Sequence, residues 1–483
     1  MPRPLVLVHG YSADAKAFHP VREALRKEAA AQKLDLIDID VCNYISLNNE
    51  ITIKDIAEGF DRALGLHAGL SKGEEFDAIV HSTGMLVVRA WLVNYGGPLS
   101  TNKRLSRLKH LIGLAPATWG SPQAHKGRTW LGALVKGNRE LGPDFLNAGD
   151  RVLEGLELGS EFTWELANED LIGEKPYYGR GADTPYVTVF IGNHPYSGIS
   201  SVANSPGSDG TVRWAGCSLN TRKITIDLRR AGTDDKRLQI SQWAVGRLDV
   251  PILAVDGRNH ATILSDPDPT MIRLILQFLG VTSDAGYTEW LKKAQEFSAR
   301  ALPQMLKNPG AGGILGGAEK LIKKLEGESE PELEGWQQFV VRACDEWGDG
   351  ISDYVMEVRR LVDGKWVNFE QMSTDVHAYG PDQSYRCFHI RLPKGISQPD
   401  QKLCVCVNAS TGTELMAYRA YGAKTIELGA GNEPIQLNIS GLGSTGKETL
   451  FYPFTTTMIE IMINREPIPF DKASRVLNFE VIQ

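Results

Sequence analysis

The chain has 483 residues, of which 42% are hydrophobic and 23% are charged. These values are typical of globular proteins and exclude disordered and fibrous classes. The formal net charge of −7 provides no basic field for a phosphate backbone, so we expect no nucleic-acid partner.

The first part of the chain alternates short apolar runs with helical patterns, which predicts βα units and a mostly parallel sheet. The expected strands are residues 4–8, 34–43, 76–80, 108–114, 186–191 and 250–255. The expected helices are residues 18–31, 53–66, 85–93, 271–279 and 287–306. Residues 115–185 interrupt this pattern with short helical pieces, and an insertion of that length favours a lid or cap.

The cap carries an apolar stripe at helical spacing, formed by Trp130, Leu131, Leu134 and Val135. Such a stripe is compatible with two roles. It could be packed core, or it could cover an apolar substrate as a mobile lid. Periodicity alone does not separate the two.

The pattern of apolar and polar residues changes near residue 330, at a Gly- and Glu-rich tract. The composition of this tract predicts a solvated linker. We therefore expect a catalytic domain at 1–305, a linker with a short helix at 306–335 and a second domain at 336–483. The second domain alternates apolar and polar residues with period two, which predicts an antiparallel β-sandwich. Its expected strands are residues 355–362, 386–392, 402–407, 415–421, 425–428, 435–439, 458–463 and 477–482.

The sequence His81-Ser82-Thr83-Gly84 stands directly between an expected strand and an expected helix. A serine on such a sharp turn projects its hydroxyl above the sheet edge, and small residues are needed where strand and helix approach. Ser82 is therefore the candidate nucleophile. The backbone N–H of Thr83 is a candidate donor to the oxyanion.

The first expected strand ends in Val8-His9-Gly10-Tyr11, where glycine would let the N–H of Tyr11 turn toward a developing negative charge. Together with H-S-T-G, this strand end resembles the lipase/esterase side of the α/β-hydrolase superfamily over residues 4–280. Two positions depart from the family's G-x-S-x-G pattern, since Val80 replaces its first glycine and Met85 stands where many members have another. The resemblance implies an α/β-hydrolase core without the family's first two strands, a cap insertion, and the C-terminal sandwich as an extra domain.

That family orders its triad as serine, acid, histidine. Asp209, in Ser208-Asp-Gly-Thr-Val212, resembles the acid loop, and His260 lies five residues after the expected strand ending at Val255. The resemblance therefore implies a triad of Ser82, Asp209 and His260. Asp256 and Asp249 remain alternative acids.

The loop Ala115–Ser121 resembles the P-x-x-G-S loop of lipases and would place Trp119 in the substrate pocket, with Trp130 and Leu134 of the cap; alternatively, Trp119 only packs beneath the insertion. The six cysteines are dispersed and read as small buried residues. No metal-ligand spacing and no nucleotide fingerprint occurs, so we expect neither a metal nor another cofactor.

The leading hypothesis is a serine hydrolase cleaving carboxylic esters, with lipid-like or aliphatic acyl chains, through an acyl-enzyme. A polyester depolymerase, a thioesterase or an amidase would use the same triad. A different class would be a non-catalytic scaffold whose sandwich binds a ligand. No run is long enough for a membrane helix, and we expect a cytoplasmic location, or secretion if a leader was removed. The expected partners are a small-molecule or lipid ester and a transient lipid-surface contact through the cap.

Overall fold

The computed structural model separates into two compact units, Met1–Thr221 with Ala244–Glu330 and Arg222–Trp243 with Pro331–Gln483. The residues whose placement it describes are 3–11, 15–33, 39–42, 46–96, 104–126, 149–174, 176–179, 184–197, 204–231, 234–240, 250–307, 332–368, 374–397, 402–421, 435–439, 449–468, 476–477 and 479. Each unit has its own hydrophobic core.

The first unit is built on a six-stranded sheet in which every neighbouring pair is parallel. In spatial order its strands are β2 (Ile39–Cys42), β1 (Leu5–Val8), β3 (Phe76–His81), β4 (Leu108–Leu114), β5 (Tyr186–Gly192) and β8 (Ile252–Val255). Strands β1, β3 and β5 are buried along their whole length, as expected for a parallel sheet covered on both faces. The predicted parallel α/β core is confirmed.

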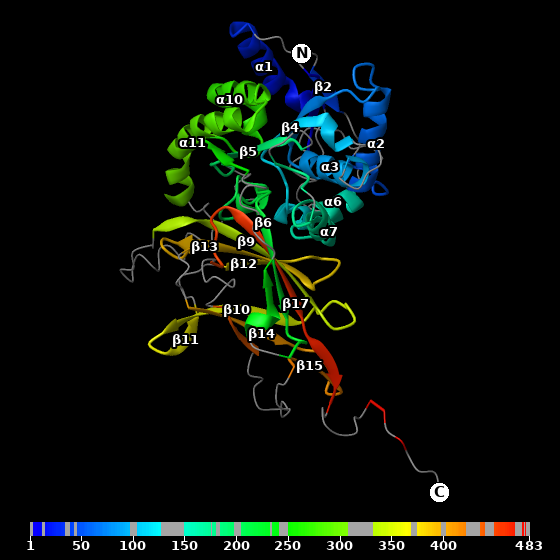
Figure 1. The fold of residues 1–483 in the computed structure, drawn as a ribbon, viewed down its shortest axis with the longest axis vertical. Coiled ribbons are helices and arrows are strands. Elements are labelled where there is room, and N and C mark those ends of the chain that lie inside the picture. The colour runs from blue at the N-terminus through cyan, green and yellow to red at the C-terminus, as the bar shows by residue number, and fades with distance from the viewer. Residues whose placement is uncertain are drawn as a thin grey trace. The chain divides into compact units, whose positions relative to one another are not determined.

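Helices cover both faces of this sheet (Figure 1). On one face lie α1 (His19–Ala31), α10 (Pro269–Leu279) and α11 (Asp284–Lys307), and on the other α2 (Ile53–Leu66) and α3 (Gly84–Trp91). Local signals fix their starts: Thr52 and Asp55 form a reciprocal capping box on α2, and the Asp268 side chain accepts two backbone N–H groups at the start of α10.

The insertion after β4 contains three short helices in its described part, α4 (Pro122–Lys126), α6 (Asp150–Leu156) and α7 (Glu161–Asp170). Gly159, at a φ of 66°, separates the last two helices. The stripe of Trp130, Leu131, Leu134 and Val135 lies outside the described residues, so its role as a lid stays a prediction.

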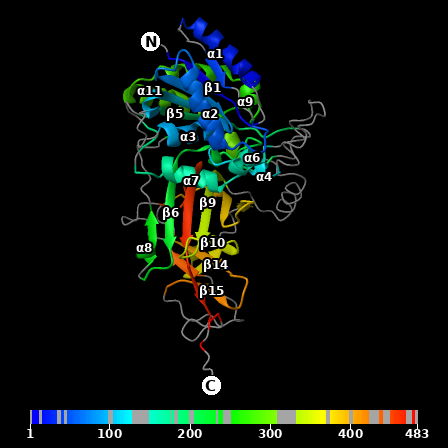
Figure 2. The same ribbon diagram turned by 90° about the vertical axis from the view of Figure 1, so that its right-hand side faces the viewer.

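The second unit contains two larger sheets, a four-stranded sheet and a six-stranded sheet, and a small ribbon of β15 and β18 (Figure 2). The core residues lie on strands of both larger sheets, among them Val341, Val405 and Ile459, which confirms the predicted sandwich. The pair of β9 and β17 departs from the antiparallel expectation, because these two strands run parallel. The strands are β9 (Leu333–Cys344), β10 (Tyr354–Val362), β11 (Lys365–Asn368), β12 (Thr374–Ala378), β13 (Tyr385–Pro393), β14 (Leu403–Ala409), β15 (Met416–Arg419), β16 (Ile435–Asn438), β17 (Thr455–Met462) and β18 (Asn464–Pro467).

Two strands of the sandwich come from the first half of the chain. The six-stranded sheet has the order β12-β13-β9-β17-β6-β7, and β6 (Thr221–Asp227) and β7 (Leu238–Ile240), joined through α8 (Asp234–Arg237), form its last two positions. Lys223 pairs with Glu460 at 2.9 Å, and buried Arg222 donates to Leu450 O at 3.0 Å. Residues 222–243 therefore fall in the compact unit of the sandwich, although the sequence had placed them within a continuous catalytic domain at 1–305.

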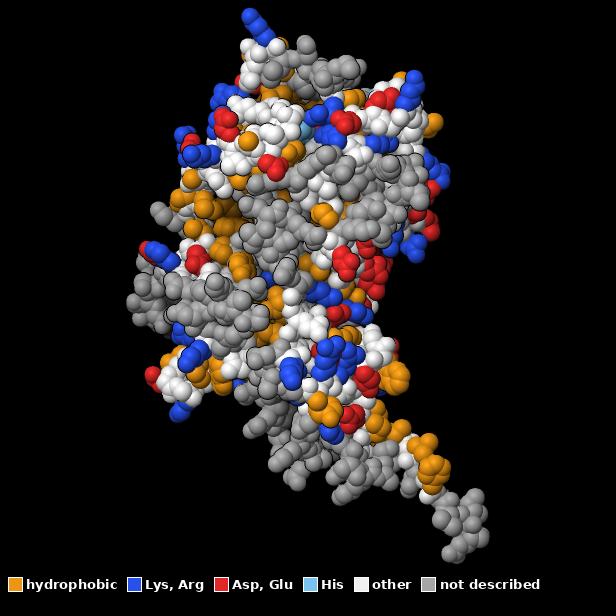
Figure 3. Space-filling view, viewed as in Figure 1, with side chains coloured by type: hydrophobic (Ala, Val, Ile, Leu, Met, Phe, Trp, Pro, Cys, Tyr) orange, Lys and Arg blue, Asp and Glu red, His pale blue; other side chains and the backbone are white. Residues whose placement is uncertain are grey.

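The expected strand at 425–428 and most of the one at 477–482 lie outside the described residues. Over the face seen in Figure 3, Lys and Arg side chains are interspersed with Asp and Glu side chains. Among the described helices, none has both the length and the apolar character needed to cross a membrane.

Candidate active site

The residues around Ser82 form a strained turn between β3 and α3. Ser82 has a φ of 52°. This backbone conformation is costly for a residue other than glycine, and residues that adopt it are concentrated at functional sites. The turn is held by Ser82 N donating to Leu114 O at 3.3 Å and Ala117 N donating to Ser82 O at 3.0 Å. This is the strand–turn–helix geometry of a nucleophile elbow.

Two glycines make this turn sterically feasible. A Cβ on Gly84 would lie 2.5 Å from Val8 O, and a Cβ on Gly10 would lie 2.8 Å from Ser82 Cβ and 3.4 Å from Ser82 Oγ. The distances of 2.5 Å and 2.8 Å are shorter than Cβ atoms tolerate, so any other residue at either position would force its neighbours to shift. The loop after β1 and the start of α3 are thereby pressed against the serine, as the motif predicts.

Asp209 and His260 meet at the carboxyl edge of the sheet. Asp209 Oδ2 lies 2.9 Å from Nδ1 of His260, and the backbone N–H of His260 donates to Asp209 O at 3.1 Å. The other carboxylate oxygen, Oδ1, accepts the N–H groups of Thr211 at 3.0 Å and Val212 at 2.8 Å. Both side chains are buried, so the carboxylate is fixed in orientation and fixes the imidazole in turn.

Of the two alternative acids, only Asp256 lies within the described residues, and its side chain contacts Asn193. Asp256 Oδ1 accepts from Asn193 Nδ2 at 2.9 Å, and Asn193 Oδ1 accepts from Gly257 N at 2.9 Å. Asp249 lies outside the described residues. Of the two described carboxylates, Asp209 is the one that contacts His260.

Two further histidines lie next to the serine. His81 Nε2 is 3.0 Å from His260 O, and the rings of His81 and His260 are 4.7 Å apart between centroids. Burial, reinforced by His260 and His9, lowers the pKa of His81 to about 3, so this ring is neutral near pH 7. His9 Nδ1 is 2.8 Å from Gly10 O.

The candidate oxyanion donors belong to elements that meet at Ser82. Tyr11 follows β1, which pairs with β3 with Val8 opposite Val80, and Thr83 is the residue immediately before α3. The first N–H groups of a helix have no intrahelical acceptor and favour negative charge. Burial, together with Asp150, raises the pKa of the Tyr11 phenol to about 12, so the phenol is neutral. The donor roles of both residues stay predictions.

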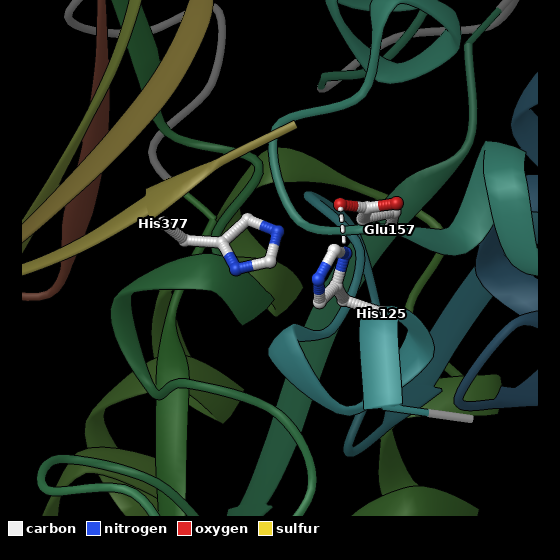
Figure 4. A group of neighbouring side chains, drawn as sticks. All are labelled: His125, Glu157 and His377. Atoms are coloured by element: carbon white, nitrogen blue, oxygen red, sulfur yellow. Dashed lines mark hydrogen bonds and ion pairs between the residues drawn. The ribbon is translucent and has the colours of Figure 1, made fainter. Parts of the chain in front are cut away.

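Of the three proposed pocket residues, Trp119 is the one that lies within the described part of the chain. Trp119 is fully buried, and its Nε1–H donates to Ser218 O at 3.2 Å, an arrangement that favours the packing role over a pocket role. Trp130 and Leu134 lie outside the described residues. In the same loop region, His125 Nδ1 lies 3.0 Å from Glu157 Oε1 (Figure 4).

A buried ion pair between α3 and α7 was not predicted from the sequence. The Arg89 guanidinium, on α3, makes two bonds of 2.8 Å to the Asp170 carboxylate of α7 and one of 2.6 Å to Thr118 O. Tyr178 OH also donates to Asp170 at 2.6 Å, and burial together with Asp170 raises the pKa of that phenol. The available signal was a lone arginine in the apolar run Gly84–Trp91. This pair joins the helix of the nucleophile to the insertion.

Comparison with known proteins defines the class of fold. The sequence matches no protein-family profile and no curated protein sequence. The structure is similar to phospholipase PlaB from Legionella pneumophila, with a TM-score of 0.70 and 20% identity over 100% of this chain and 98% of that chain. The structure of PlaB in complex with thio-NAD gives a TM-score of 0.68 and 21% identity over 99% and 97%.

These likenesses extend over both units of the chain. The parallel sheet with its elbow serine has an α/β-hydrolase fold, and the sandwich is a second, all-β domain. The expected fold class is confirmed.

Proposed function

We propose that this protein is a serine hydrolase that cleaves carboxylic esters with Ser82, His260 and Asp209 as its triad. The observation that carries the proposal is the 2.9 Å contact between Asp209 and His260 at the same sheet edge as a serine with a φ of 52°. Ring contact between His260 and His81, the residue before Ser82, supports this placement.

The proposed reaction runs in two steps. Ser82 Oγ attacks the ester carbonyl carbon while His260 Nε2 takes the hydroxyl proton, and the same proton then passes to the leaving alcohol as the ester C–O bond breaks. A water molecule, deprotonated by His260, then attacks the carbonyl carbon of acyl-Ser82; the bond to Ser82 Oγ breaks, the acid is released and His260 returns the proton to Ser82. Asp209 holds Nδ1–H and stabilises the imidazolium, and the N–H groups of Tyr11 and Thr83 bind the oxyanion.

For the substrate we propose esters with lipid-like or aliphatic acyl chains. Support comes from the apolar residues of the 115–185 insertion and from the phospholipase with the similar fold. A thioester, an amide or a polyester would pass through the same acyl-enzyme. Competition between such substrates would therefore identify the preferred leaving group. A transient contact of the insertion with a lipid surface, a cytoplasmic location and the absence of a cofactor belong to the same proposal.

A fluorophosphonate probe tests the nucleophile directly. We expect covalent labelling of wild-type Ser82 and none of Ser82→Ala, with Ser71→Ala, a change at an exposed serine, labelled as the wild type. A well-folded wild-type protein that takes no label would contradict the hydrolase and favour the non-catalytic scaffold.

A panel of p-nitrophenyl esters from acetyl to palmitoyl, with a diacylphospholipid beside it, tests the substrate class. If the insertion is a cap, replacing Trp130 and Leu134 with serine should raise KM for the long chains and leave acetyl and butyryl esters nearly unchanged. Equal losses for all chain lengths with a lowered Tm would assign these residues to the core.

A further inference from the structure

We propose that His81 is a positioning residue that fixes His260 against the nucleophile elbow through a hydrogen bond to the backbone carbonyl of His260. The inference rests on the proposed function, since it concerns the geometry of the same serine and histidine. It assigns a role to a side chain that the triad mechanism does not use.

The contacts of His260 define a three-point hold. Asp209 Oδ2 meets ring Nδ1 at 2.9 Å, Asp209 O accepts the backbone N–H at 3.1 Å, and His81 Nε2 meets the backbone carbonyl at 3.0 Å. Asp209 therefore fixes the imidazole ring and the backbone N–H of His260. The third contact comes from strand β3, the strand that ends immediately before Ser82.

This third contact connects His260, the proposed base, to the strand that carries Ser82, the proposed nucleophile. Asp209 belongs to a separate loop and could move together with His260 as a pair. His81 is covalently adjacent to Ser82, so its bond fixes the His260 loop in the frame of the elbow itself. A misplacement of about 1 Å between reacting groups can cost roughly 100-fold in rate.

The tautomer of His81 follows from its partner. A carbonyl oxygen only accepts, so Nε2 carries the proton and Nδ1 of the neutral ring presents a lone pair. His81 Nδ1 is buried and has no hydrogen-bond partner among the described residues, and it would lie 3.3 Å from a Cβ on Gly10. A protonated ring would bury a second N–H against this glycine, so the packing accepts the neutral form.

A neutral His81 also suits the charge that forms during the reaction. The imidazolium of His260 would develop beside the His81 ring, whose centroid is 4.7 Å from that of His260. A second positive charge at this separation would oppose proton transfer from Ser82. Burial keeps that charge away, with a pKa for His81 of about 3.

The test compares His81→Phe, which keeps a ring and loses the donor, with His81→Gln, whose amide can place a donor near the position of Nε2. We expect His81→Phe to lower kcat about 10- to 100-fold with KM changed less than about threefold, and His81→Gln to recover most of the loss. Wild-type kcat in folded His81→Phe would overturn the inference, as would equal losses in the two folded variants.

His110 supplies a matched control, because its Nε2 lies 2.8 Å from Val281 O in a buried site at the other end of the sheet. His110→Phe and His110→Gln should lower Tm and leave kcat within about twofold of wild type. A kcat loss in His110→Phe equal to that in His81→Phe would overturn the inference, because it would show a general effect of softening the fold. Wild-type protein that neither labels with fluorophosphonate nor hydrolyses esters would instead overturn the proposed function itself.

Discussion

Strand β3 begins beside one histidine–aspartate pair and ends beside another. At its amino end, Asp77 Oδ1 lies 2.7 Å from Nδ1 of His110 on the neighbouring strand β4. Beyond its carboxyl end, Asp209 Oδ2 lies 2.9 Å from Nδ1 of His260. Both pairs are buried, and by distance alone they are nearly equivalent.

The two pairs differ in what surrounds them. At the amino end, His110 Nε2 is engaged by Val281 O at 2.8 Å, and Arg3 Nε binds Asp77 at 3.2 Å. Both ring nitrogens of His110 are therefore committed to the fold. At the carboxyl end, the structural contacts of His260 fall on its backbone and on Nδ1, and a strained serine follows the same strand. A histidine–aspartate pair thus indicates catalysis only together with its position on the sheet.

The largest expected effect is a loss of kcat in variants at the carboxyl end of β3. We expect Ser82→Ala, His260→Ala and Asp209→Ala each to lower kcat by roughly three to six orders of magnitude, because each removes a part of one proton-transfer unit. Ester hydrolysis and circular dichroism on the same preparations would check this. An Asp209→Ala enzyme with most of its activity, beside an inactive Asp256→Ala enzyme, would reassign the acid.

The Arg89–Asp170 pair tests whether a buried ion pair near the elbow must be catalytic. Both side chains have 0% exposure. Removing one partner leaves the other charge buried without compensation, so Arg89→Met should cost about 3–5 kcal/mol of the free energy of unfolding. The double variant Arg89→Met/Asp170→Leu should recover part of that loss, as measured by urea denaturation. A fully folded Arg89→Met protein of unchanged stability, with reduced kcat, would show a catalytic role instead.

A smaller loss of stability should mark the amino end. Asp77→Asn keeps the shape but removes the charge that faces Arg3 and His110, and we expect it to lower the free energy of unfolding by about 1–3 kcal/mol. Its kcat should stay within about twofold of wild type, because Ser82 lies at the opposite end of β3. A kcat loss comparable with that of Asp209→Ala would break the distinction between the two ends.

The contrast also shows what could be predicted from the sequence. The strands of the parallel sheet and the elbow followed from local patterns, because buried parallel strands are short apolar runs. Asp209 and His260 were named from the family resemblance, and the structure places the two side chains in contact. Contacts set by tertiary packing could not be read in this way. Arg89 gave no indication of Asp170 as its partner, and β6 gave no sign that it would pair with β17 rather than join the parallel sheet. His81 was visible only as part of the motif, since its bond to His260 spans 179 positions.

The last predicted effect is a dependence of stability on pH to which His81 contributes, and it grows gradually as the pH falls. The pKa of His81 is about 3 in the folded protein, below the ordinary value of about 6.5 expected in the unfolded chain. Between these two values the unfolded state binds a proton that the folded state does not, so stability falls as the pH is lowered from about 6.5 toward 3. One such group contributes at most about 1.4 kcal/mol per pH unit.

His81→Phe removes this group, while His260 and His9, which face it, are present in both proteins. The difference in free energy of unfolding, wild type minus His81→Phe, should therefore decrease as the pH falls from 7 to 5 in urea titrations. Carboxylates titrate lower and are common to both chains, so they do not produce this difference. Parallel curves over that range would show that His81 takes up a proton as readily in the folded state as in the unfolded one. A neutral His81 ring would then no longer distinguish the carboxyl end of β3 from its amino end.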